Sequence, residues 1–249
     1  MLVIDAISEI LKKEVIKYLS AFPTTSVIEA AAESGIKPII CRQERVGVGI
    51  ADGYSRITGG NPPGVFAMQY GPGAENAYPG VATAYADAVP MLFLPLGHRR
   101  DRDRIFPHFN SVDSFSSVTK YVEQINDVSS VSDTMRRAFY RLKNGRPGPI
   151  MVEIPIDIAD KEIDESAVSQ YQKAITVRSS ADEDAVMRVA KTILTSNTPL
   201  LYAGQGVIYS GASKELQELS ELTNIPVATT MAGKGSIDER HPLSLGSSS

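Results

Sequence analysis

The chain has 249 residues, of which 43% are hydrophobic and 22% are charged, and its formal net charge is −4. This composition is typical of a globular protein with one or two domains. No block of basic residues is present, so we expect neither nucleic acid nor an anionic membrane as a partner. The sequence also has no apolar run near the roughly 20 residues that cross a bilayer, no secretory signal, and a single cysteine, Cys41. These features predict a cytoplasmic protein.

The first 60 residues predict helices, a strand and a polar turn. Residues 5–18 carry apolar side chains at helical spacing, and residues 27–34 form a second helix that ends at a glycine. The apolar run 38–41 is typical of a strand, and Glu44 follows it at the start of a helix rich in glycine and alanine. Small residues indicate that this third helix lies close to a neighbouring backbone.

A second polar turn follows the next predicted strand, residues 65–69. It contains Gly71, Pro72 and Gly73 and leads into an alanine-rich helix that carries Asn76. Open α/β sheets bind ligands at the carboxyl ends of their strands, so Glu44 and this turn are candidates for one site. For Glu44 a structural interpretation stays open as well, because an acidic residue in the first turn of a helix offsets the helix dipole.

The middle of the chain predicts a polar loop between two strands. A strand at 91–94 precedes the highly charged segment 97–104, which contains His98, and the chain continues to His108, Phe109 and Asn110. A loop histidine usually serves only as a solvated or hydrogen-bonded side chain, so this interpretation stands beside a catalytic one. A helix at 133–142 and a strand at 150–155 follow.

The last part of the chain predicts a second unit. A helix from residue 184, a strand at 198–203, a helix at 211–222 and a strand at 225–229 resemble half of a Rossmann fold. The loop that contains Gly204 and Gly206 lacks the full dinucleotide fingerprint. No His, Cys and Asp cluster has the spacing of metal ligands, so we propose no metal site built by this chain.

Taken together, these motifs resemble the pyrimidine-binding domain of thiamine diphosphate enzymes, in the acetolactate synthase and 2-oxo acid decarboxylase branch. The resemblance is carried by Arg42-Gln43-Glu44, by the segments 51–56, 71–76 and 86–90, and by 145–149 before the strand at 150–155. It implies an α/β fold in which a three-layer, parallel-sheet pyrimidine-binding domain spans residues 1–165. A linker, 166–182, and part of a Rossmann-like middle domain, 183–249, follow.

The resemblance also implies roles for single residues. Glu44 takes the place of the glutamate that hydrogen-bonds a ring nitrogen of the cofactor's aminopyrimidine and assists proton removal from the thiazolium carbon. His108 and Asn110 fall where members of the two branches place substrate-contacting residues, and the branches differ in which of the two matters. The residues implied to bind the cofactor are Glu44, Gly71, Pro72, Gly73, Asn76 and Phe109.

The implied activity is decarboxylation of a 2-oxo acid with carboligation, by a transferase or lyase that is a homodimer or homotetramer. In the family, Mg²⁺ and the diphosphate are held by a third domain whose Gly-Asp-Gly motif is not found here, so we expect this chain alone to be inactive. Some members bind FAD in the middle domain, and the resemblance leaves this open. Two alternatives remain: a truncated or split chain that needs a separate diphosphate-binding domain, and a nucleotide-binding module that uses Gly204 and Gly206.

Overall fold

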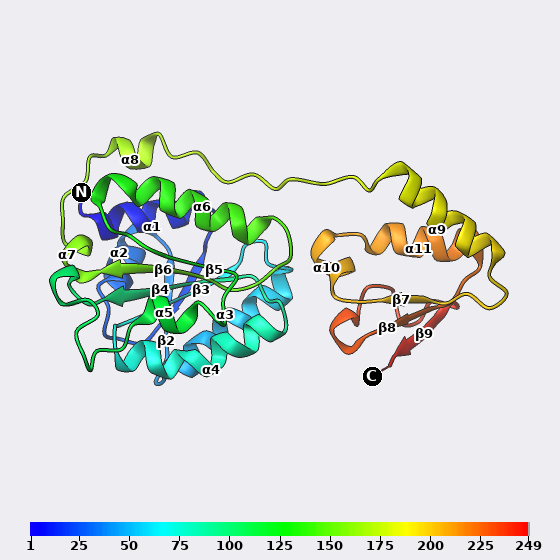
Figure 1. Cartoon of the computed structure of the whole chain (residues 1–249), viewed down its shortest axis with the longest axis horizontal. Helices are drawn as coiled ribbons and strands as arrows, with labels where there is room; N and C mark the ends of the chain where they lie inside the picture. Colours follow the sequence, from blue (N-terminus) through cyan, green and yellow to red (C-terminus); the bar gives the residue numbers. More distant parts are fainter. Residues whose placement is uncertain (249) are drawn as a thin grey trace. The chain divides into compact units, whose positions relative to one another are not determined.

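The computed structural model describes residues 1–248. The chain separates into two compact units, Met1–Val177 and Arg178–Ser249 (Figure 1). No helix among the described residues is both long enough and apolar enough to cross a lipid bilayer.

A six-stranded, fully parallel sheet forms the centre of the first unit, with the strand order β2-β1-β3-β4-β6-β5. Three of the four inner strands, β3, β4 and β6, are buried along their whole length, which explains their nearly continuous apolar sequences. The predicted α/β fold with a parallel sheet is thus confirmed. The strands are β1 (Tyr18–Ala21), β2 (Lys37–Ile40), β3 (Gly64–Met68), β4 (Met91–Gly97), β5 (Tyr121–Gln124) and β6 (Ile150–Pro155).

Helices cover both faces of this sheet and make it the middle of three layers (Figure 1). One face packs against α1 (Val3–Lys13), α2 (Val27–Ser34), α6 (Val131–Lys143), α7 (Ile156–Ala159) and α8 (Ser166–Ser169). The other packs against α3 (Glu44–Thr58), α4 (Pro72–Ala86) and α5 (Ser111–Phe115). Two short 3₁₀ helices, η1 (Arg100–Arg102) and η2 (Val128–Ser130), lie in the connecting segments.

The prediction of one helix over residues 5–18 is wrong at its carboxyl end. Helix α1 ends at Lys13, and Val15 has a φ of 66°, a left-handed conformation that does not continue a helix. Tyr18 instead begins β1, which pairs with β2 and β3. Pairing with these distant segments outweighs the local helical pattern.

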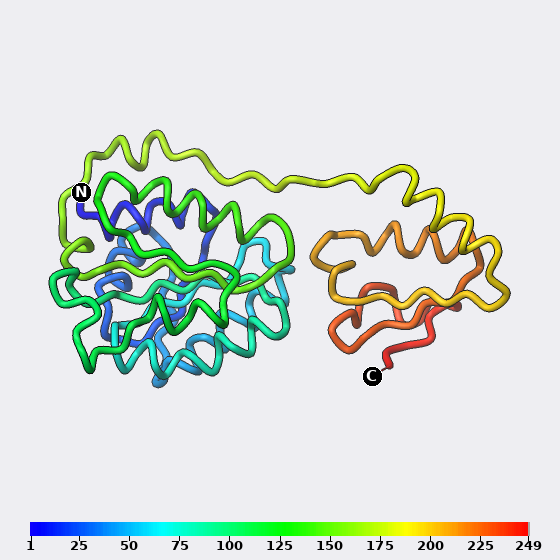
Figure 2. The backbone as a smooth tube through the Cα atoms, in the orientation of Figure 1, coloured from blue at the N-terminus to red at the C-terminus, as the bar shows by residue number. Residues whose placement is uncertain are grey.

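The segment after β6 packs on the first unit as far as Val177, although the sequence predicts a linker over 166–182 (Figure 2). The buried carboxylate of Glu14 accepts hydrogen bonds from the Tyr171 hydroxyl and the Ala174 amide, both at 2.8 Å. It also forms an ion pair with Lys143. A buried charge is tolerated when it is paired and hydrogen-bonded in this way, so this network holds the segment in place.

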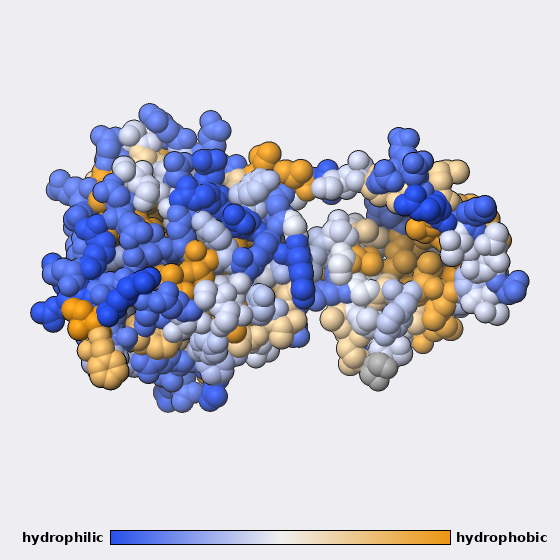
Figure 3. Space-filling model, in the orientation of Figure 1, coloured by the Kyte–Doolittle hydropathy of each residue, from blue (hydrophilic) through white to orange (hydrophobic). Residues whose placement is uncertain are grey.

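The second unit contains a three-stranded parallel sheet in the order β7-β8-β9. None of the residues of α9 is buried, and apolar side chains on α9 and at the ends of the strands are exposed, including Leu194 and Leu245. Figure 3 shows apolar side chains gathered on this unit. Its elements are α9 (Glu183–Thr195), β7 (Leu201–Ala203), α10 (Gly206–Ser210), α11 (Ser213–Thr223), β8 (Val227–Thr229), η3 (Met231–Gly233) and β9 (Ser244–Ser247).

Helix α3 lies unusually close to the sheet of the first unit. A Cβ atom at Gly47 would lie 2.3 Å from the ring of Phe66, and a Cβ atom at Gly64 would lie 2.0 Å from the carbonyl oxygen of Ala51. Both distances are too short for any side chain, so glycine is required at these two positions.

Matched substitutions in α3 test this packing. Gly47→Ala should lower the free energy of unfolding by about 1 to 3 kcal/mol, because the added methyl group overlaps the Phe66 ring. Gly53→Ala should raise it by about 0.5 to 1 kcal/mol, because a Cβ there meets no atom within 4 Å and alanine favours the helix. Urea unfolding measures both values, and equal effects of the two substitutions would contradict the packing described.

Candidate functional site

The carboxyl edge of the first sheet contains a topological switch point. Strand β1 lies between β2 and β3, and the chain leaves β1 toward α2 on one face but leaves β3 toward α4 on the other. Such divergence opens a crevice at the carboxyl ends of the strands, where α/β proteins bind ligands. Glu44 and the turn before α4 both lie on the α3–α4 side of this edge.

Glu44 is a buried carboxylate at the first position of α3, with 4% of its surface exposed. Its position follows from the close packing of α3, in which the Ser20 hydroxyl donates a hydrogen bond to the Gly47 carbonyl at 2.8 Å. The Asn76 side-chain amide donates to Glu44 Oε2 at 3.2 Å. A Cβ at Gly73 would lie 3.4 Å from Glu44 Oε1. The structure therefore brings together three residues that were predicted from two separate motifs.

The turn before α4 presents backbone rather than side chains to this carboxylate. Gly71 has a φ of 59°, a conformation that favours glycine, and Pro72 occupies the first turn of α4, where its fixed φ is suited to a helix start. Gly73 follows without a side chain. A planar ring could therefore approach the main chain here more closely than at an ordinary turn.

Two histidines and a tyrosine form a stack beside this turn. The rings of His98 and His108 are parallel within 5° at a centroid distance of 4.3 Å, and Tyr70 lies 4.5 Å from His98 on a tilted plane. Tyr70 directly precedes Gly71, so the stack connects the turn before α4 to the loop after β4. The His98 Nε2 atom is buried and has no hydrogen-bond partner among residues 1–248. The sequence did not reveal Tyr70 as part of this stack, because its contact with His98 joins positions 28 residues apart.

Phe109 and Asn110 lead from this loop into α5. Phe109 is partly buried and meets Phe115 edge to face at 6.3 Å. Asn110 is the N-cap of α5, and its side-chain oxygen accepts a hydrogen bond from the Asp113 amide at 2.8 Å. His108 is exposed, with Nδ1 at 3.3 Å from the Arg102 carbonyl. Their predicted contact with a substrate stays a prediction.

Sequence reasoning also missed Glu153, a second buried carboxyl group at the same edge of the sheet. It is 5% exposed, and the Gln124 side-chain amide donates to its Oε2 at 2.6 Å. Burial raises the pKa of Glu153. A signal was present in the sequence, because Glu153 is the only charged residue in the apolar strand 150–155, and an isolated charge in such a strand is seldom buried without a partner.

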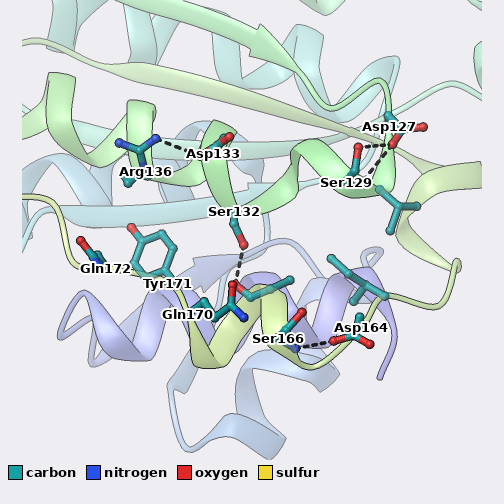
Figure 4. Close-up of a pocket in the computed structure, with 13 residues that line it drawn as sticks. Asp127, Ser129, Ser132, Asp133, Arg136, Asp164, Ser166, Gln170, Tyr171 and Gln172 are labelled. Carbon is teal, nitrogen blue, oxygen red and sulfur yellow. Dashed lines mark hydrogen bonds and ion pairs between the residues drawn. The ribbon is translucent and has the colours of Figure 1, made fainter.

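A groove of the first unit lies elsewhere, between α6 and α8, with a volume of about 700 Å³ (Figure 4). None of the predicted site residues lines it. Its three aspartates already have partners within the groove: Asp127 bonds Ser129, Asp133 pairs with Arg136, and Asp164 accepts from the Ser166 amide. These internal pairs leave little unsatisfied polarity for a ligand.

The glycine loop of the second unit also offers little to a nucleotide. Gly206 begins α10, which has only five residues before Gly211 ends it in a left-handed conformation. A helix this short has few aligned peptide dipoles to stabilise a phosphate.

The histidine stack predicts a measurable effect of pH. Burial and the neighbouring His108 lower the pKa of His98, partly opposed by Asp103. In the unfolded chain a histidine binds a proton below about pH 6.5, whereas folded His98 does so only at lower pH. The stabilisation that neutral His98 contributes to the folded state is therefore fully present above about pH 6.5. This stabilisation is lost as the pH falls through the lowered pKa of the folded state.

Imidazole titration by NMR checks this prediction. The His98 midpoint should lie below that of a free histidine, and His108→Ala should raise it, because the substitution removes a neighbouring charge and part of the burial. His241→Ala, in the second unit, is the matched control and should leave the midpoint unchanged. A His98 midpoint that His108→Ala does not move would contradict the stack.

Two parts of the chain match known protein families. Residues 1–127 match the family described as thiamine pyrophosphate enzyme, N-terminal TPP binding domain, and residues 186–249 match the thiamine pyrophosphate enzyme central domain. Thiamine pyrophosphate is a synonym of thiamine diphosphate.

Several curated relatives cover nearly the whole chain. A probable acetolactate synthase large subunit from Methanocaldococcus jannaschii is 34% identical over 254 residues, which cover 97% of this chain and 42% of the relative. A protein of the same description from Methanococcus aeolicus is 33% identical with the same coverage. An acetolactate synthase from Arthrospira platensis is 35% identical over 91% of this chain and 40% of its own length. The chain thus spans about two fifths of the relatives it matches, and on the two domain matches it belongs to the thiamine pyrophosphate enzyme family.

Proposed function

We propose that this chain forms the aminopyrimidine-binding half of a thiamine diphosphate site in an enzyme of the acetolactate synthase type. Such an enzyme decarboxylates a 2-oxo acid and joins the remaining fragment to an acceptor. The domain matches and the relatives named acetolactate synthase support this proposal. The observation that carries it is the buried carboxylate of Glu44, held beside Asn76 and Gly73.

The chemistry of these groups suits an aminopyrimidine ring. A carboxylate has about four acceptor positions, and within the described part of the chain a single donor, Asn76, contacts Glu44, at 3.2 Å. The remaining positions can accept a hydrogen bond from a ring nitrogen, and the turn at Gly71 and Gly73 gives a flat ring access to the backbone. When bound, thiamine diphosphate supplies the electron sink for cleavage beside a carbonyl group.

The protein groups then have separate tasks. Glu44 holds or moves a proton at the pyrimidine nitrogen, in a buried position where water does not compete. Asn76 fixes the orientation of that carboxylate. Phe109 contributes an apolar wall, and His108 and Asn110 face the 2-oxo acid from the loop after β4.

The diphosphate and its metal need further protein groups. Within residues 1–248, no cluster of three or more His, Cys, Asp or Glu side chains could hold a metal ion. We infer that Mg²⁺ and the diphosphate are held by another domain, in the same polypeptide or a separate one, and that the enzyme assembles as a homodimer or homotetramer. The family allows FAD to bind to the domain that the second unit matches, and the proposal does not depend on FAD.

Substitution of Glu44 tests the proposed role. In the assembled enzyme, which is this chain together with its diphosphate-binding domain, Glu44→Gln should slow exchange of the thiazolium C2 proton by about 10²- to 10⁴-fold, because the amide cannot transfer the proton. Proton exchange is measured by quenched-flow NMR. Glu75→Gln is the matched control, an exposed glutamate in the first turn of α4, and should leave exchange unchanged. Near-normal exchange in Glu44→Gln would refute the role.

Substitution of Gly73 tests whether the aminopyrimidine ring approaches the backbone of this turn. A side chain at Gly73 would meet Gln69 Cγ at 2.8 Å and Glu44 Oε1 at 3.4 Å, inside the space assigned to the ring. Gly73→Val should therefore weaken cofactor affinity by about tenfold or more in calorimetric titration. The free energy of unfolding of the cofactor-free protein should fall by less than the corresponding loss of binding free energy. Equal losses of melting temperature with and without cofactor would count against the assignment.

A further inference from the structure

The loop after β4 is tied to the rest of the first unit by Arg100, a residue that the proposed reaction does not use. Arg100 is the first residue of η1. Its backbone amide donates a hydrogen bond to Asp157 Oδ1 at 3.0 Å, and its Nε atom donates to Asp157 Oδ2 at 2.8 Å. Its guanidinium also donates to the Asn126 carbonyl. Arg100 thus binds both oxygens of one carboxylate and reaches a second segment of the chain.

These contacts join the carboxyl ends of three neighbouring strands. Arg100 follows β4, Asp157 lies in α7 directly after β6, and Asn126 follows β5. The three strands are adjacent in the sheet, in the order β4-β6-β5, and Gly97 at the end of β4 is paired with Pro155 at the end of β6. Arg100 is therefore held both by its own strand and by the segments that leave the two neighbouring strands.

The ion pair between Arg100 and Asp157 differs from the other ion pair of the same turn. Arg99 pairs with Asp101, but these side chains are 58% and 65% exposed, and exposed pairs contribute little because water and salt screen them. The Asp157 side chain is only 15% exposed. Burial acts to raise the pKa of Asp157, but the hydrogen bonds and the charge of Arg100 outweigh it and lower this pKa. Hydrogen bonds to a charged group are among the strong ones, so this pair can hold the turn.

The turn that Arg100 begins also contacts the His108 ring. The Arg102 amide donates to the Arg99 carbonyl at 2.8 Å, and the Arg102 carbonyl lies 3.3 Å from His108 Nδ1. A carbonyl oxygen only accepts, so a neutral His108 in this contact carries its hydrogen on Nδ1 and leaves Nε2 free as an acceptor. The stack with His98 fixes the plane of the ring but does not choose which nitrogen carries the hydrogen.

We propose that Arg100 and Asp157 form a clamp that positions η1 and keeps neutral His108 in the Nδ1–H tautomer, with Nε2 left to accept a hydrogen bond or a proton. Arg100 and Asp157 are positioning residues, since they act on His108 only through the Arg102 carbonyl. The assignment of His108 to the substrate side of the site rests on the proposed function. The clamp does not, because all of its contacts lie within the described chain.

Nitrogen-15 NMR of the histidine rings in the 249-residue chain tests this proposal without cofactor. The spectrum distinguishes the two tautomers of a neutral imidazole, so it is recorded near pH 8, above the ordinary histidine pKa of about 6.5. Wild-type His108 should be in the Nδ1–H form. Arg100→Gln and Asp157→Asn should each shift His108 toward a mixture of tautomers, because Nδ1 loses its fixed partner.

The exchange rate of the Arg102 amide is a second measure of the same turn. Both variants should speed this exchange by about threefold or more, because the hydrogen bond to the Arg99 carbonyl opens more often. The double variant should add little to the larger single effect, since both substitutions break one clamp. Amides of the buried strand β3 report on global opening and should keep their protection in Arg100→Gln, which replaces only the outer part of an exposed side chain.

Asp101→Asn is the matched control. It removes a carboxylate from the same turn, but this carboxylate forms only the exposed ion pair with Arg99. The tautomer of His108 and the exchange rate of the Arg102 amide should therefore stay as in the wild type.

Several results would overturn the proposal: a wild-type His108 that carries its hydrogen on Nε2, a tautomer that neither Arg100→Gln nor Asp157→Asn changes, additive effects in the double variant, or an equal response to Asp101→Asn. A cofactor site that fails the Glu44 test would leave these spectra unaffected, so the two proposals fail independently.

Discussion

The close approach of α3 to the central strands is the constraint on which the site depends. Gly47 and Gly64 leave no room for a side chain between this helix and the sheet, and the Ser20 hydroxyl bonds both the Gly47 and the Val65 carbonyls at 2.8 and 3.1 Å. The first turn of α3 is thus fixed by backbone contact with the sheet. Glu44 stands on that turn and needs no loop to hold it, so the proton transfer proposed for it would start from a fixed geometry.

Two buried carboxyl groups share this face of the sheet, and in the part of the chain described each accepts one side-chain hydrogen bond. Neither Glu44 nor Glu153 forms a salt bridge in the part of the chain described, and burying a charge without one is costly. Gln124 donates to Glu153 at 2.6 Å, and Asn76 donates to Glu44 at the longer distance of 3.2 Å. A carboxylate has about four acceptor positions, so the role proposed for Glu44 uses positions that Asn76 leaves free.

The sequence was sufficient where the signal is local. The helix predicted at 133–142 corresponds to α6, and the glycine turn before α4 was recognised because glycine and proline restrict the backbone by themselves. Strands β1 and β5 have four residues each, and their conformation comes from pairing with distant segments, so no local pattern predicted them. The contact between Glu44 and Asn76 joins positions 32 apart, and a one-dimensional pattern could suggest both residues but not their hydrogen bond.

The two sides of the site also differ in how they are held. Glu44 and Gly73 belong to helices of 15 residues each that pack on the core, whereas His108 and Asn110 belong to a segment that ends in a five-residue helix and includes Phe106, which is 93% exposed. A cofactor common to a family requires fixed partners, while substrate choice can change through a loop that a rigid scaffold supports. A short segment of this kind still needs one firm point to present its side chains reproducibly. Phe115, the last residue of α5, provides that point, because its buried ring packs against Phe93 of β4 at a centroid distance of 5.0 Å.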